Sequence, residues 1–119
     1  MAKQDLARLL KALDAMPKAA RKAIQPAIDK GADELVGRMK LLAPENEGEL
    51  RDSIRSEPGP QPLSRTVFTD NDAALYQEYG TENMPASPFF WVSERSLRKR
   101  VRGRIDRAIG KAIRDEWKK

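Results

Sequence analysis

The sequence predicts an α+β fold in which a small antiparallel β-sheet packs against long amphipathic helices. Three observations favour this class: two long apolar runs at helical spacing, a short alternating segment between them, and a length of 119 residues, which suits one domain. We therefore expect a single domain over residues 1–119, made of a first helix at 4–15, a long second helix at 18–43, short strands and loops at 50–81, and a long C-terminal helix at 88–117.

The first helix is predicted by four leucines that recur at i, i+3, i+4 and i+7 within residues 4–15. Pro17 is expected to end it. Its apolar face needs a partner, because a helix this short is marginal alone.

The second helix is predicted by an apolar stripe that runs from Ala20 to Leu42. Pro26 lies inside this run, where it either kinks the helix or marks its first turn. Gly31 falls on the apolar stripe and indicates close packing against another helix rather than a hinge. The pair Ala43–Pro44 ends the helix, since a residue before proline is pushed out of the α region.

The middle of the chain predicts two or three antiparallel strands. Alternation over residues 50–55 favours the start of a strand, whereas residues 57–62 contain three prolines and a glycine and are expected to form a loop or a polyproline arm. The best strand is residues 64–69, which a turn at 70–72 ends. Residues 73–79 fit a helical turn or a strand equally well.

The C-terminal helix is predicted to begin at Ser87 and Pro88, as an N-cap followed by a first helical position. An apolar arc from Leu97 to Ile113 is expected to dock on the sheet. The net charge is +5, and residues 91–119 hold eleven Lys or Arg against four Asp or Glu. Six of these cations form what we call the basic stripe: Arg100, Arg104, Arg107, Lys111, Arg114 and Lys118.

The absence of cysteine and histidine excludes several classes of site. Disulfides, sulfur or imidazole metal sites and catalysis by Ser-His-Asp or Cys-His groups are all ruled out. We expect no cofactor and no catalytic or metal site. No segment has the length and apolarity of a membrane span or a signal peptide, so no membrane partner is expected and the cytosol is the favoured compartment.

Two charged groups and one aromatic cluster remain as candidate sites. An acidic loop is favoured as a solvated surface, over a cation site or a catalytic carboxylate, because nothing nearby would shift a pKa. For the basic stripe an acidic protein partner is favoured, with a solvated face and contact to a nucleic-acid backbone as alternatives. The aromatic residues Phe89, Phe90 and Trp91, beside Tyr76 and Tyr79, are expected in the core, with part left for an oligomer contact. The acidic loop holds Glu45, Glu47, Glu49 and Asp52.

Two motifs resemble those of a family of small tailed-phage proteins. The first passes from a helix end through "Ala-Pro", "Gly-x-Leu" and "Ser-Ile"; here Glu47 stands where a threonine is usual. The second joins "Glu-aromatic-Gly-Thr" to "Met-Pro-Ala-x-Pro-Phe". The family comprises the neck, or head–tail joining, proteins of lambdoid-type siphophages, also described as minor tail components or tail completion proteins after a gene-product-ten prototype. The motif positions are Ala43, Pro44, Gly48, Leu50, Ser53, Ile54, Glu78, Tyr79, Gly80, Thr81, Pro88 and Phe89.

The resemblance, which spans most of residues 17–117, implies a non-enzymatic virion subunit at the head–tail junction, made in the host bacterial cytoplasm. It implies a homo-oligomeric ring, a hexamer as in siphophage tails, beside other junction and tail-tube proteins. Ring closure needs two different patches on each subunit, and the acidic loop and the basic stripe are candidates. The alternative is a small basic protein that binds the phosphate backbone of nucleic acid through its C-terminal helix, and a basic face could also meet genomic DNA within a ring.

Overall fold

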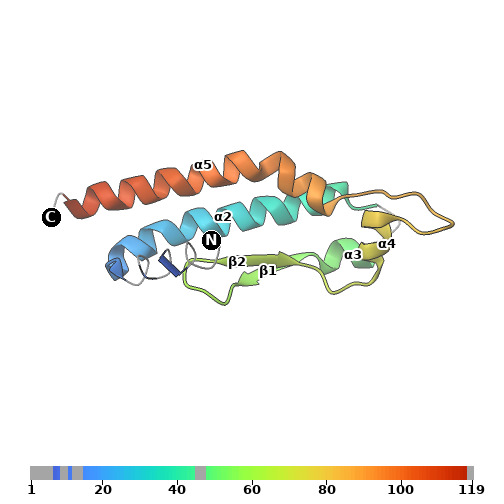
Figure 1. Ribbon diagram of the computed structural model, residues 1–119, viewed down its shortest axis with the longest axis horizontal. Helices are drawn as coiled ribbons and strands as arrows, with labels where there is room; N and C mark the ends of the chain where they lie inside the picture. Colours follow the sequence, from blue (N-terminus) through green and yellow to red (C-terminus); the bar gives the residue numbers. More distant parts are fainter. Residues whose placement is uncertain (1–6, 9–10, 12–14, 45–47, 118–119) are drawn as a thin grey trace.

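The structure is a computed structural model that describes residues 7–8, 11, 15–44 and 48–117. The helix predicted at 4–15 lies mostly outside these residues. The chain passes through two long helices, a hairpin and two short helices (Figure 1). In order, the elements are α2 (Lys18–Leu42), α3 (Gly48–Ser53), β1 (Arg55–Pro58), β2 (Arg65–Phe68), α4 (Ala73–Tyr79) and α5 (Phe90–Trp117).

The elements form three layers with α2 in the middle, between α5 on one side and the β1–β2 hairpin on the other (Figure 1). The α+β class is confirmed, but the expectation that α5 docks on the sheet is wrong. Its apolar arc packs on α2, because two strands of four residues offer too little surface for a helix of 28 residues. The long α2 therefore uses two faces, one for each neighbouring layer.

The molecule is long and thin. Its principal extents are 61, 28 and 21 Å, and its radius of gyration is 17.3 Å, whereas a compact domain of this length has about 13–14 Å. None of the helices that the structure describes is long and apolar enough to cross a membrane. The two ends of the subunit therefore lie far apart.

Close packing joins α2 to α5 at Gly31. A Cβ atom added there would lie 2.7 Å from Cγ1 of Val101, so only glycine lets the two helices approach this closely. This confirms the packing predicted at Gly31. Pro26 lies eight residues inside α2, so it does not mark the first turn of the helix. The predicted end at Ala43 is confirmed, since Ala43 has extended backbone and its N–H donates to the carbonyl of Met39 over 2.9 Å.

The segment after α2 differs from its prediction. Residues 50–53 are helical rather than extended: α3 buries Leu50, and Ile54, which directly follows the helix, is buried in the same group. The first strand begins only at Arg55, and it includes Glu57 and Pro58, which were expected in a loop. Pro58 is accommodated because it is the last residue of an edge strand, where it pairs with Arg65.

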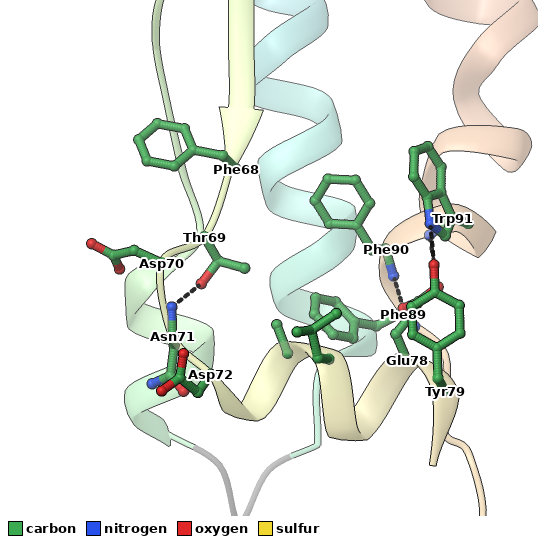
Figure 2. A pocket seen from close by; sticks show the side chains of 12 residues that line it. Phe68, Thr69, Asp70, Asn71, Asp72, Glu78, Tyr79, Phe89, Phe90 and Trp91 are labelled. Atoms are coloured by element: carbon green, nitrogen blue, oxygen red, sulfur yellow. Dashed lines mark hydrogen bonds between the residues drawn. The ribbon is translucent and has the colours of Figure 1, made fainter.

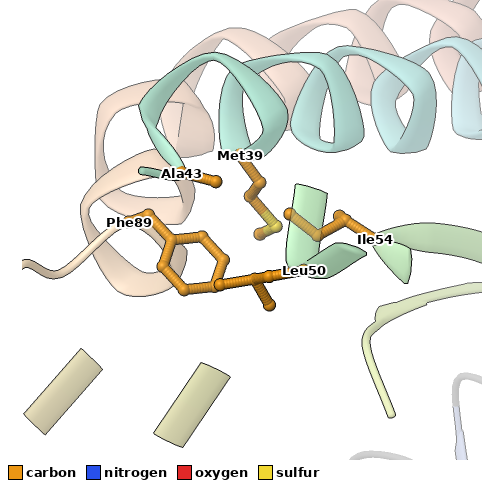
Figure 3. Close-up of a cluster of buried hydrophobic side chains, with 5 residues drawn as sticks. All are labelled: Met39, Ala43, Leu50, Ile54 and Phe89. Carbon is orange, nitrogen blue, oxygen red and sulfur yellow. The ribbon is translucent and has the colours of Figure 1, made fainter. Parts of the chain in front are cut away.

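Two groups of buried side chains stabilise the two ends of the molecule. The larger group gathers where α2 ends, beside α3 and the start of α5 (Figure 3). The smaller group lies where α2 begins and α5 approaches its C-terminus. The large group is Met39, Ala43, Leu50, Ile54 and Phe89, and the small group is Ala20, Ile24 and Ala112.

Candidate functional site

The junction between α4 and α5 is held by one carboxylate, that of Glu78. Its Oε1 accepts hydrogen bonds from the backbone N–H groups of Phe89 (3.0 Å) and Phe90 (2.9 Å), and its Oε2 accepts one from Trp91 (3.2 Å) (Figure 2). These N–H groups have no partner inside the helix, and the positive end of the helix dipole favours a carboxylate there. Glu78 therefore caps α5 from another helix.

This cap corrects the predicted start of the C-terminal helix. The helix begins at Phe90, two residues after Pro88, and Ser87 is not its cap. The Ser87 N–H instead donates to the carbonyl of Gln77 over 2.7 Å, which ties the loop back to α4. A distant carboxylate replaces the local hydroxyl because this loop brings α4 against the start of α5.

A tight turn returns the chain from α4 to α5. Gly80 has a φ of 78° and its N–H donates to the carbonyl of Tyr76 over 2.8 Å. A Cβ atom there would lie 2.8 Å from the backbone nitrogen of Ala86, so the position requires glycine. Thr81 and Met84 then exchange backbone hydrogen bonds of 2.9 and 3.3 Å. The residues of the second sequence motif therefore fold together as the turn that joins α4 to α5.

The aromatic residues divide between the core and the surface. Phe89 is fully buried, and Phe90 packs edge-on against Trp91 at 5.1 Å between ring centroids. Trp91 remains 50% exposed and Tyr79 67% exposed, with the indole N–H of Trp91 3.4 Å from the Tyr79 hydroxyl (Figure 2). Tyr76 is also exposed. The cluster is core on one side and open surface on the other.

The first sequence motif connects α2, α3 and the hairpin. Leu50 and Ile54 are buried in the large group. The Ser53 hydroxyl lies 2.6 Å from the carbonyl of Leu50 and 2.5 Å from the hydroxyl of Thr69, so it joins α3 to the segment after β2. Gly48 begins α3 and nothing crowds its Cβ position. This motif supports the fold: its buried members are Ala43, Leu50 and Ile54.

The first two members of the basic stripe are paired within the chain. Arg104 and Arg100 both pair with Glu34 on α2, Arg100 through Nε at 3.1 Å from Oε2. The close contact with Arg104 lowers the pKa of Glu34, and the charge of Arg100 lowers it further. The first two members of the stripe therefore hold α5 on α2.

The next three members of the stripe lie on the outer surface of α5. We call Arg107, Lys111 and Arg114 the distal cations; all three are exposed, and the structure gives them no ion pair within the part of the chain that it describes. Lys118 lies outside the described residues. These cations are available to a partner.

The predicted acidic loop is not a loop where the structure describes it. Glu49 and Asp52 are exposed on α3, whereas Glu45 and Glu47 lie outside the described residues. Among the described residues, no three acidic side chains gather closely enough to hold a metal ion. Glu49 and Asp52 therefore form an exposed acidic surface beside the large buried group.

Two functional carboxylates of the structure were missed by sequence reasoning. Glu34 was not selected, although Arg100 and Arg104 stand four residues apart and can share one carboxylate; the sequence does not indicate which helix supplies it. The sequence identifies Glu78 as a motif residue but does not indicate its capping role. Its role depends on the turn at Gly80, which a linear pattern does not reveal.

The comparisons with known proteins identify the family. The family described as "Bacteriophage HK97-gp10, putative tail-component" matches residues 7–80, which is more than half of the chain. No curated protein and no solved structure gives a significant match. The matched residues include α2, α3, both strands and α4, whereas α5 lies beyond them. The chain therefore belongs to the HK97-gp10-like family of bacteriophage tail components.

Proposed function

We propose that this protein is a non-enzymatic structural subunit of the head–tail junction, a neck or tail completion component that assembles into a ring. In this role it docks on neighbouring junction and tail-tube proteins of the virion after assembly in the host bacterial cytoplasm. The family match over residues 7–80 carries the proposal, because it indicates a phage tail component.

The shape and charge of the subunit support assembly. A ring needs a heterologous contact, in which one surface of each subunit meets a different surface of the next. Glu49 and Asp52 lie near the end of the molecule that holds α3, and the distal cations lie near the end where α5 terminates (Figure 1). Opposite charge at opposite ends suits such a contact.

The ion pairs of Glu34 favour the distal cations over Arg100 and Arg104 as candidates for this contact. Arg100 and Arg104 are engaged within the chain, so reversing their charge would disturb the packing of α5 on α2 as well as assembly. The distal cations are the better target, because they are exposed and form no ion pair among the described residues.

Deletion of the gene from the phage or prophage that carries it tests the proposed role. Electron microscopy is expected to find filled heads and separate tails that do not join, and the intact gene supplied in trans should restore complete particles. Complete particles in the absence of the gene would contradict a junction role.

Contact with nucleic acid is the alternative, favoured by one observation. Lys18, Arg21 and Lys22 line a shallow hollow at the start of α2, at the end where the distal cations also lie. Such a cluster can neutralise several phosphates, and the binding would weaken steeply with salt. A duplex DNA shift assay across a salt series, with Lys18, Arg21 and Lys22 each changed to Glu as the comparison, separates this function from partner binding that persists without DNA.

A further inference from the structure

Beside the α4–α5 junction the surface contains a hollow of about 450 Å³, which we call the aromatic hollow (Figure 2). Its wall is mostly apolar, with Phe68 from β2, Leu75 and Tyr79 from α4, and Phe90 and Trp91 from α5. Leu75, Tyr79 and Trp91 are each at least half exposed. A group of large apolar side chains left open to water in one place marks a contact surface.

The lining of the aromatic hollow contains carboxylates and no Lys or Arg. Residues 66–94, which supply its entire lining, contain five carboxylates and no Lys or Arg. Three of the five, Asp70, Asp72 and Glu78, lie on the lining itself. Asp70 and Asp72 are exposed, Asp70 is paired with Arg55, and Glu78 caps α5, so Asp72 is the lining carboxylate left for a partner among the described residues. Aromatic faces beside carboxylates suit a cationic occupant, since both attract a guanidinium or an ammonium group.

The protein already binds one guanidinium in this way. Arg55 lies 4.5 Å above the ring centroid of Phe68, while its Nη2 pairs with Oδ2 of Asp70 at 3.0 Å. This pair occupies one edge of the aromatic hollow. Asp72, with Tyr79 and Trp91 across the hollow, offers the same two kinds of group a second time, and no cation among the described residues is paired with them.

The distal cations fit this surface. Arg107, Lys111 and Arg114 follow i, i+4, i+7 spacing, so they project from one face of α5 over its last turns. Their long apolar stems can cover aromatic surface while the charged groups reach carboxylates. They cannot reach the aromatic hollow of their own chain, because the two surfaces lie near opposite ends of a molecule 61 Å long.

We infer that the aromatic hollow of one subunit receives the distal cations of a second copy of this chain. The contact is head to tail, so each subunit uses one end as acceptor and the other as donor. Repetition of such a contact closes a ring if the rotation between neighbours allows it. The inference rests on the proposed ring assembly and names the two surfaces that form it.

Two variants of the full chain separate the two surfaces. The donor variant carries Arg107→Glu, Lys111→Glu and Arg114→Glu and keeps its aromatic hollow. The acceptor variant carries Asp72→Lys and Trp91→Ala and keeps its distal cations. All five side chains are exposed, so both variants are expected to fold, and circular dichroism with thermal unfolding checks this.

The masses of each variant and of their mixture, measured at low salt by sedimentation velocity, test the inference. The wild-type chain is expected to form species larger than the 13.4 kDa monomer, and each variant alone is expected to stay monomeric. Their mixture should form a dimer and nothing larger, because only one contact can form between an intact hollow and intact cations.

A matched control keeps the charge change and moves it to the other face of the helix. Arg95→Glu, Lys99→Glu and Arg102→Glu together reverse three exposed cations of α5 that point away from the basic stripe. This variant should assemble as the wild-type chain does.

Several outcomes would overturn the inference. They are a monomeric wild-type chain, a donor or acceptor variant that keeps the wild-type mass, and a mixture that yields no dimer. Loss of DNA binding by the donor variant with unchanged assembly would assign the distal cations to nucleic acid instead. None of these results affects the gene-deletion experiment, so failure of this contact and failure of the junction role can be told apart.

Discussion

The two ends of the molecule are built differently. At the end where α2 finishes, large side chains including Leu50 and Phe89 are fully buried, and Glu78 caps the start of α5. At the other end the buried group, among the described residues, holds two alanines and Ile24, while exposed cations lie on α5. Among the described residues, one end therefore supplies most of the packing that stabilises the fold, whereas the other end has a small buried group and carries exposed cations.

Core truncation at each end tests this difference most strongly. Phe89→Ala should lower the free energy of unfolding by about 3–5 kcal/mol, because it empties the centre of the large buried group. Ile24→Ala should cost about 2–3 kcal/mol, since the side chain is smaller and the thin end can partly collapse. Urea unfolding followed by circular dichroism measures both. An equal or larger loss at Ile24 would contradict the comparison.

Removal of the cap tests what orders the acceptor end. Glu78→Ala should cost about 2–3 kcal/mol, because three N–H groups lose a charged acceptor. Glu78→Gln should cost less, since an amide oxygen still accepts. Glu82→Ala is the control, because Glu82 is exposed on the nearby turn. A Glu78→Ala variant as stable as the control would show that the cap contributes nothing.

Adding a single Cβ atom at Gly31 tests the close contact between α2 and α5. Gly31→Ala should cost about 1–2 kcal/mol, because its Cβ would meet Val101 at 2.7 Å. Adding Val101→Ala should recover part of that loss if the clash is its cause. Gly37→Ala is the matched control: nothing lies within 4 Å of its Cβ position, so it should stabilise α2 by about 0.5–1 kcal/mol. Chemical denaturation of the three variants and the wild-type chain checks this, and no difference between Gly31→Ala and Gly37→Ala would refute it.

The smallest effect concerns the ion pairs of Glu34. Arg104 lowers the pKa of Glu34 below its ordinary value of 4.5, so its contribution to stability is present above that value and is lost as the pH falls through the lowered pKa. Urea midpoints measured from about pH 6 down to about pH 3 should therefore fall less steeply for Glu34→Gln than for the wild-type chain. Asp33→Asn, at an exposed neighbour, should leave the slope unchanged. Identical slopes for Glu34→Gln and wild type would contradict the role of the pair.

The elements with long or strong patterns were predictable from the sequence. The apolar stripes gave both long helices almost to their ends, and the β-branched run gave β2. Gly31 indicated the close helix contact correctly. These predictions succeed because each depends on local periodicity or on one residue type with one physical property.

The predictions that failed depended on tertiary contacts. Leu50 and Ile54 fit a strand or a helix equally well over so few residues, and burial beside Met39 decides for α3. Ser87 is a good local cap, but Glu78 reaches the same N–H groups once Gly80 turns the chain. The sequence likewise did not show that α5 packs on α2, because an apolar arc does not name its partner.

Zero-length crosslinking of the wild-type assembly tests the central claim, that opposite ends of neighbouring subunits meet, most directly. A carbodiimide joins an amine to a carboxylate in contact with it, and Lys111 is too far from Asp72 and Glu82 for this within one chain of 61 Å. Mass spectrometry of mixed isotope-labelled and unlabelled subunits is expected to find Lys111 joined to Asp72 or Glu82 of a different chain. An assembly whose interchain crosslinks all avoid this pairing would contradict the head-to-tail contact.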